Sequence, residues 1–123
     1  MKVNIGEYGP QGERVSEVHI DDWDTWSMDV TLAYIIVPML IQLRDTCHGA
    51  PLVADEDVPE VLRRIDDGGD IDEFYFDRWD YVLNEMIFAF KMKAEEFDAL
   101  EEDTKRISNG FRLFGKYYSD LWD

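Results

Sequence analysis

The longest apolar stretch of the chain is Met28-Asp-Val-Thr-Leu-Ala-Tyr-Ile-Ile-Val-Pro-Met-Leu-Ile-Gln-Leu-Arg-Asp-Thr46. Apolar side chains fall on nearly every face of a helix drawn through these residues, which is typical of a helix in the middle of a fold. Pro38 lacks a backbone N–H and predicts a kink against the carbonyl of Tyr34. Gly49 and Pro51 follow, and both residue types commonly end helices. The stretch therefore predicts a central helix at 28–46.

The residues before this helix predict a β-hairpin. Residues 2–5 alternate polar and apolar side chains, as do residues 14–20, and the turn-forming residues 9–12 separate the two runs. Val15 and Val18 break the alternation by one residue, which indicates a β-bulge. We expect one face of this hairpin to lie on the core.

The residues after the central helix predict two more helices. Apolar side chains recur at helical spacing over residues 76–100 and again over residues 104–122. The segment 52–73 reads as a loop, in which Pro59 opens one or two helical turns through Leu62. The expected fold is α+β, a single domain over residues 1–123 in which a two-stranded N-terminal β-hairpin packs on a mostly α core of three helices.

Composition excludes several classes of protein. Apolar residues make up 46% of the chain and aromatic residues 14%, which is too much for a disordered acidic tail. The net charge of −16 argues against general binding to DNA, RNA or an anionic membrane, because each of these needs a basic surface. Cys47 is the only cysteine, and the first residues lack the apolar segment of a signal peptide. We therefore expect a soluble, intracellular protein.

The charge is distributed unevenly along the chain. Residues 1–103 carry 8 Lys/Arg and 26 Asp/Glu, a net charge of −18, whereas residues 104–123 carry 4 and 2, a net charge of +2. The last predicted helix is therefore basic and aromatic at the end of an acidic protein. This asymmetry indicates that the helix binds either an anion or the acidic surface of the protein itself.

The spacing of the basic residues predicts a ligand site on that helix. Arg106, Asn109, Arg112 and Lys116 recur every three or four residues and share one helix face. Guanidinium groups bind phosphate through paired hydrogen bonds, an Asn side chain suits a base or ribose edge, and an aromatic ring stacks on a base. We predict a nucleotide-type anion as the ligand, bound by Arg106, Asn109, Arg112, Lys116 and Tyr117.

The same residues have a structural interpretation. The cations can pair with the many acidic side chains of the surface, and such exposed pairs are individually weak. Gly110 and Gly115 each cost about 1 kcal/mol in a helix relative to Ala, and a glycine permits close packing of another helix or of a ligand.

The carboxylates supply an enzymatic alternative. Glu85, Glu95, Asp98 and Asp29 fall on predicted helices, and carboxylates on neighbouring helices are how Mg²⁺ is held for pyrophosphate cleavage. Only half of the acidic pattern of the all-α nucleotide pyrophosphohydrolases is present, because Val82 occupies one of its positions. A solvated acidic face is the structural interpretation of these residues.

Other catalytic patterns do not occur in the sequence. His19 and His48, with a single cysteine, are too few for a zinc site. The sequence contains no Ser/His/Asp order and no glycine-rich phosphate loop. We therefore predict no catalytic residue, no metal site and no cofactor.

Distinctive segments occur along most of the chain. They are Met1-Lys-Val-Asn-Ile-Gly6, Ile20-Asp-Asp-Trp-Asp-Thr-Trp-Ser-Met-Asp29, His48-Gly-Ala-Pro51, Asp55-Glu-Asp-Val-Pro59, Arg78-Trp-Asp-Tyr-Val-Leu-Asn-Glu-Met-Ile87 and residues 105–123. In these segments the chain resembles a family of small proteins that tailed bacteriophages encode and that have no assigned function. The resemblance implies a phage product acting in the cytoplasm of an infected bacterium. It carries over no catalytic residue.

These observations lead to three functional hypotheses. The first is a phage-encoded accessory protein, a non-enzymatic binder that interferes with host physiology or defence and takes a small anion or a host protein at its basic C-terminal helix. The second is an acidic decoy that mimics nucleic acid for a host protein. The third is a Mg²⁺-dependent nucleotide hydrolase. Trp122, close to the end of the sequence, also predicts a partner surface, and a homo-oligomer through this end is one expectation.

Overall fold

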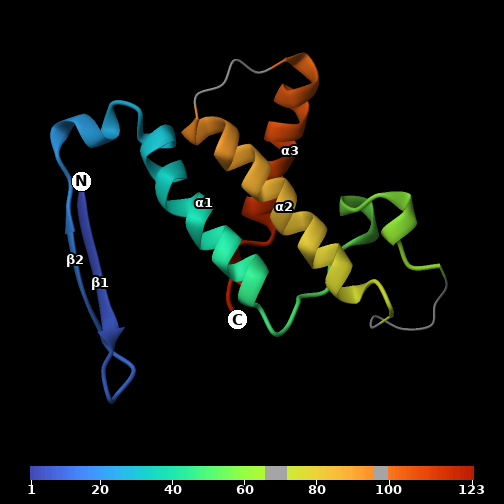
Figure 1. The fold of residues 1–123 in the computed structure, drawn as a ribbon, viewed down its shortest axis with the longest axis horizontal. Helices are drawn as coiled ribbons and strands as arrows, with labels where there is room; N and C mark the ends of the chain where they lie inside the picture. The colour runs from blue at the N-terminus through green and yellow to red at the C-terminus, as the bar shows by residue number, and fades with distance from the viewer. Residues whose placement is uncertain (66–71, 96–99) are drawn as a thin grey trace.

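Three long helices form the body of the fold (Figure 1). The computed structural model describes residues 1–65, 72–95 and 100–123. Within them, α1 (Met28–Thr46) and α3 (Glu101–Lys116) both pack against α2 (Tyr75–Ala94), which lies between them. The predicted α+β class, a two-stranded hairpin with three helices, is confirmed.

The central helix is α2, and the expectation that residues 28–46 would form it is wrong. Nine residues of α2 are buried, whereas α1 buries only Ala33 and Leu40 completely. Tyr34 and Met39 of α1 are 65% and 67% exposed. The reason is geometric: α1 contacts the body along one side only, so its remaining apolar side chains have no covering element among the described residues.

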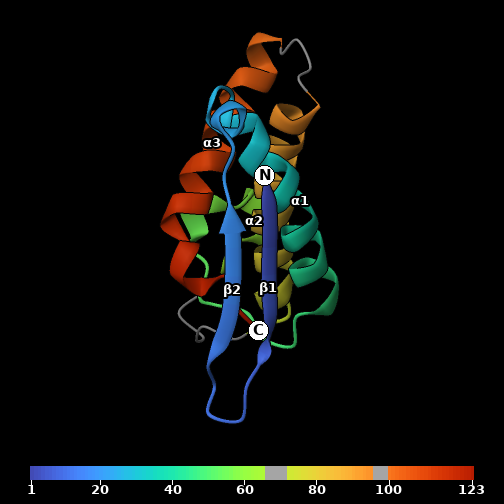
Figure 2. The ribbon, with the colours of Figure 1, turned by 90° about the vertical axis from the view of Figure 1, so that its left-hand side faces the viewer.

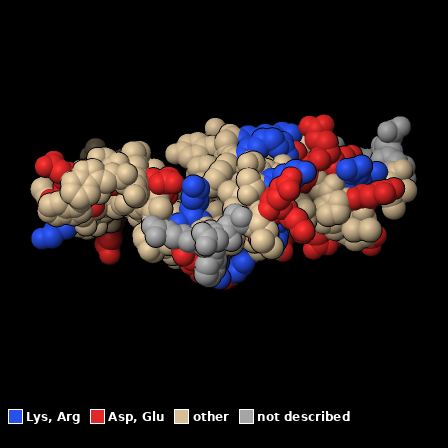
Figure 3. Space-filling view, turned by 90° about the horizontal axis from the view of Figure 1, so that it is seen from above, with Lys and Arg blue, Asp and Glu red and all other residues tan. Residues whose placement is uncertain are grey.

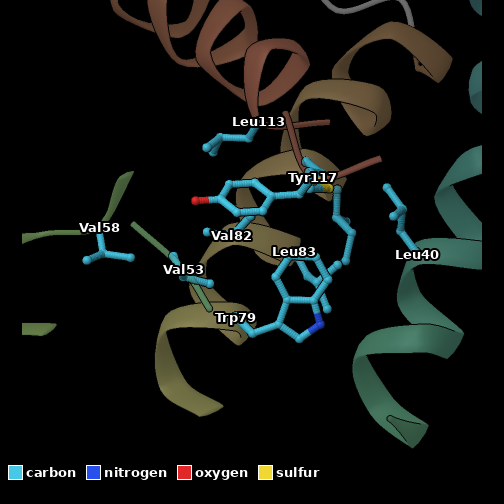
Figure 4. Close-up of a cluster of buried hydrophobic side chains, with 10 residues drawn as sticks. Leu40, Val53, Val58, Trp79, Val82, Leu83, Leu113 and Tyr117 are labelled. Carbon is cyan, nitrogen blue, oxygen red and sulfur yellow. The ribbon is translucent and has the colours of Figure 1, made fainter. Parts of the chain in front are cut away.

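The hydrophobic core forms where α2 meets both neighbours and the segment that precedes it (Figure 4). Trp79 of α2 is its largest member, and Leu83 of the same helix is fully buried. Each large side chain removed from water in this way contributes about 1.5–3 kcal/mol. The other labelled members are Leu40 of α1, Leu113 and Tyr117 at the end of α3, Val82 of α2, and Val53 and Val58 of the segment between α1 and α2.

Helix α1 and the short helix after Pro59 have the predicted bounds. The bounds of α2 and α3 differ from the predicted ones. The short 3₁₀ segment η3 (Glu60–Leu62) follows Pro59. Helix α2 ends at Ala94, before the predicted end at residue 100, and residues 96–99 lie outside the described part. Helix α3 begins at Glu101, earlier than predicted, and ends at Lys116, before the predicted end at residue 122. Three acidic residues occupy its first turn, where the helix dipole favours negative charge.

Three further 3₁₀ segments complete the described structure: η1 (Asp22–Thr25) before α1, η2 (Asp55–Asp57) in the segment between α1 and α2, and η4 (Tyr118–Asp120) after α3. No helix in the described ranges has the length and apolar character needed to cross a membrane.

The N-terminal hairpin consists of β1 (Lys2–Tyr8) and β2 (Arg14–His19). Gly12 in its turn has φ of +80°, a conformation that favours glycine. The register passes from Ile5 opposite residue 16 to Tyr8 opposite Arg14. The extra residue therefore lies in β1, so the predicted bulge is present on the strand opposite the one expected.

The hairpin stands beside the helical body, and the expected burial of one of its faces is wrong. Figure 2 shows the sheet in front of the helical body, with β1 and β2 side by side and α1 to the right of them. Val3, Ile5, Val18 and Ile20 lie on one face and are between 45% and 56% exposed. The two strands pack mainly on each other, so this apolar face is left without the cover that its alternating pattern implies.

Gly110 sets the distance between α2 and α3. A methyl group at this position would lie 2.5 Å from the Cβ of Ala89 and 2.6 Å from the backbone oxygen of Glu85. The prediction that a glycine permits close helix packing is confirmed here. At Gly115, by contrast, an added Cβ meets nothing within 4 Å.

Gly110→Ala should therefore destabilise the protein, while Gly115→Ala should not. Forcing a methyl into a packed contact costs about 1–3 kcal/mol, whereas Ala gains up to about 1 kcal/mol over Gly in an open helix position. Urea unfolding of both variants measures the difference. Equal stability of the two variants would contradict the close approach.

Candidate functional site

The structure gathers four of the five predicted ligand residues around one carboxylate, Asp57 of η2. Arg112 Nη2 donates to Asp57 Oδ1 at 2.8 Å, and Lys116 Nζ donates to Oδ2 at 2.6 Å. The Tyr117 hydroxyl also donates to Oδ2 at 2.6 Å. Asn109 Oδ1 accepts a hydrogen bond from Arg112 Nε at 3.0 Å. We call these five residues the Asp57 cluster.

The side chain of Asp57 is completely buried, which makes its partners necessary. Burial would raise the pKa of the Asp57 carboxyl, but the hydrogen bonds from Lys116, Tyr117 and Arg112 outweigh it and lower the pKa. The hydrogen bond to Asp57 in turn raises the pKa of Lys116. Burial and the bond to Asp57 raise the pKa of Tyr117. The cluster is thus an ion-pair network with its anion in the interior.

Tyr117 extends this network to the backbone. Its hydroxyl accepts a hydrogen bond from the backbone N–H of Ala54 at 3.0 Å, while its ring packs edge to face on Trp79. The end of α3 is therefore joined through one side chain to both the core and the segment that carries Asp57.

Arg106, the fifth predicted residue, pairs with a different carboxylate. Its Nε and Nη2 donate to Glu85 Oε2 on α2 at 3.0 and 2.7 Å. The guanidinium carbon also lies 3.7 Å from the centre of the Phe88 ring. Arg106 thus joins α3 to α2, whereas the Asp57 cluster joins α3 to η2.

The basic side chains of this helix face therefore form ion pairs with acidic side chains of the same protein, as their structural interpretation predicts. Lys116 also contacts Glu56 at 3.1 Å. Arg112 and Lys116 keep 49% and 36% of their side chains exposed, so an anion can reach them only in competition with Asp57. Anion binding at this face stays a prediction.

The carboxylates of the hydrolase hypothesis are engaged with cations. Glu85 binds Arg106, Asp29 lies 3.2 Å from Lys93, and Glu95 lies 4.0 Å from Lys91. Asp98 lies outside the described residues. Within the described ranges, no group of three or more His, Cys, Asp or Glu side chains is arranged to hold a metal ion.

Sequence reasoning missed Asp57. It is one of three acids in Asp55-Glu-Asp57, and the residue types alone do not distinguish the buried one from its less buried neighbours. The only local signal is that Val58 follows it, an apolar residue that enters the core.

A second candidate is the set of exposed apolar side chains on the hairpin, η1 and the outer side of α1, which we call the N-terminal apolar surface. Trp26 is the most exposed at 78%. Figure 3 shows this end of the molecule as mostly uncharged, while Lys, Arg, Asp and Glu are interspersed over the remainder. The surface comprises Val3, Ile5, Val18, Ile20, Trp23, Trp26, Met28, Leu32, Tyr34 and Met39.

A smaller feature lies at the C-terminal end. A pocket of about 220 Å³ is lined by Gly49, Ala50, Pro51, Asp120, Trp122 and Asp123. Beside it, the backbone N–H of His48 donates to Asp123 Oδ1 at 2.6 Å, and His48 Nδ1 lies 2.8 Å from Oδ2. Trp122 is exposed, and its role in a homo-oligomer stays a prediction.

No protein-family model, no curated protein and no solved structure matches the chain.

Asp57→Asn should lower the free energy of unfolding by about 2–4 kcal/mol at pH 7, because it removes the anion that Arg112 and Lys116 share. Glu56→Gln is the matched control, since Glu56 is an exposed partner of the same lysine and its loss should change stability by about 0.5 kcal/mol or less. Urea unfolding measures both changes.

The pH dependence gives an independent check. Because the cluster lowers the pKa of Asp57, its stabilisation is present above the unfolded value of about 4 and is lost as the pH falls through the lower folded value. The stability of the wild type should therefore decrease more steeply than that of Asp57→Asn below about pH 4. Parallel curves for the two proteins would show that Asp57 has an ordinary pKa.

Proposed function

We propose that this protein is a non-enzymatic, protein-binding accessory protein, and that it docks another protein on its N-terminal apolar surface. In an infected bacterium, the setting that the phage resemblance implies, such docking would interfere with host physiology or defence. The observation that carries the proposal is the exposure of ten large apolar side chains on consecutive elements, the hairpin, η1 and α1.

The size and kind of this surface support protein docking. A contiguous apolar patch on a soluble protein is rarely larger than a few hundred Å², and larger ones are typical of interaction sites. Trp23 and Trp26 belong to the residue types that contribute most to binding energy at protein interfaces. The hairpin also forms a two-stranded sheet in the described structure, so each strand has an outer edge that a partner strand can extend.

Salt distinguishes this proposal from the acidic decoy. A decoy relies on the net charge of −16, and its complexes weaken as ions screen that charge. Docking on apolar side chains is not screened in this way. Figure 3 also shows acids and bases interspersed on the viewed face, whereas a nucleic-acid mimic needs a continuous acidic one.

Photo-crosslinking tests the docking surface directly. A photoreactive residue at Val18 should crosslink the full-length chain to protein in a bacterial lysate, at both low and high salt, because Val18 lies on the apolar face. The same residue at Glu17 is the control, since Glu17 and its partner Asn4 lie on the opposite, polar face. Equal crosslinking from both positions, or none from Val18, would contradict the proposal.

A second candidate is the anion site on α3, supported by the partial exposure of Arg112 and Lys116. If an anion binds there, it competes with the carboxylate of Asp57. Asp57→Asn should then strengthen the binding of pyrophosphate, and Arg112→Ala should weaken it about tenfold or more, which corresponds to a charged hydrogen bond of about 1.5–3 kcal/mol. Isothermal titration measures both effects. Unchanged or absent pyrophosphate binding in all three proteins would exclude this site.

A further inference from the structure

Three of the exposed apolar side chains of α1, Met28, Leu32 and Met39, lie on a second helical stripe. With the half-buried Ile35 they follow one another at intervals of four, three and four residues, which places them on one side of the helix. The core-facing residues Ala33, Ile36, Leu40 and Leu43 also recur every three or four residues, and they lie on the adjacent side of the helix. Helix α1 thus has two adjacent apolar stripes, and α2 covers only one of them.

One face of the hairpin is likewise apolar and uncovered. Val3, Ile5, Val18 and Ile20 lie on one side of the sheet, and Lys2, Asn4, Glu17 and His19 lie on the other. An amphipathic sheet face of this kind is normally covered by a helix or a second sheet. Here both the sheet face and the outer stripe of α1 remain exposed in the same molecule.

We propose that a second copy of the chain covers both surfaces, in a two-fold dimer where the hairpin of each molecule packs on the outer stripe of α1 of the other. This inference rests on the proposed function, because the dimer uses the same docking surface, and a host protein would dock there by displacing the second copy. A two-fold arrangement uses each surface once per molecule and leaves neither uncovered.

The area is sufficient for a stable dimer. Seven exposed apolar side chains lie on the two surfaces that this dimer buries: Val3, Ile5, Val18, Ile20, Met28, Leu32 and Met39. They offer on the order of 600 Å² per molecule, which is at the lower end of the roughly 600–1,000 Å² that each partner buries in a specific interface.

The lengths and charges also agree. Strand β1 has seven residues and spans about 23 Å, while the stripe from Met28 to Met39 spans about 17 Å. Residues 1–20 carry 2 Lys/Arg and 3 Asp/Glu, and residues 28–46 carry 1 and 2, so together they contribute −2 of the net charge of −16. Two acidic molecules would therefore meet through elements that carry little of the net charge.

Sedimentation velocity over a concentration series tests the dimer. The wild type should sediment as a dimer in high salt, and Val18→Lys and Met39→Glu should each raise its dissociation constant by roughly a hundredfold, as expected for a charge placed at the centre of an apolar interface. Asn4→Lys, on the polar face, is the matched control and should leave the dimer intact. Circular dichroism should show unchanged folding, because Val18 and Met39 are exposed in the single molecule.

Mixing the variants tests the exchange of hairpins. An equimolar mixture of Val18→Lys and Met39→Glu should form a heterodimer, in which one contact is native and the other pairs Lys with Glu. A monomeric wild type, dimeric single variants or a mixture that stays monomeric would each overturn the inference. If the wild type is monomeric but Val18 still crosslinks to a different protein, the inference fails and the proposed function stands. If there is also no crosslink from Val18, both fail.

Discussion

The carboxylate of Asp57 holds the segment between α1 and α2 against the end of α3. In its described residues that segment has only the short 3₁₀ turns η2 and η3, and it nevertheless contributes Val53 and Val58 to the core. A buried carboxylate without partners would cost several kcal/mol, so the core can close here only when Arg112, Lys116 and Tyr117 are in place. The packing of the loop and the position of the C-terminal turn therefore depend on one ion-pair network.

This dependence explains the unusual charge distribution of the chain. The basic residues of α3 are concentrated there because two buried or nearly buried acids, Asp57 and Glu85, face that helix from different elements. The basic helix that predicted an anion-binding site therefore binds the protein's own carboxylates first. Binding to another protein accordingly has its best physical support at the opposite end of the molecule, where the exposed side chains are apolar and have no such internal partners in the described structure.

Local patterns predicted the hairpin, the bounds of α1 and the short helix after Pro59, because alternation, helical spacing and proline act over a few residues. They did not predict which helix is central. An all-round apolar pattern in α1 shows that several of its sides avoid water, but it does not say whether its own chain or another molecule covers them. Likewise, the spacing of Arg112 and Lys116 placed them on one face, whereas the identity of their partner depends on a contact 55 or more residues away in sequence.

The contacts between elements also bear on how the chain folds. The extensive pairings join β1 to β2, α1 to α2 and α2 to α3, which are all consecutive in the sequence. Contacts of this kind close short loops and form early, while contacts between distant residues form late. The joining of Asp57 to the end of α3, like that of His48 to Asp123, is a long-range step, so a nascent chain can complete it only after α3 has left the ribosome. Until then the residues around Asp57 would stay accessible to proteases and chaperones.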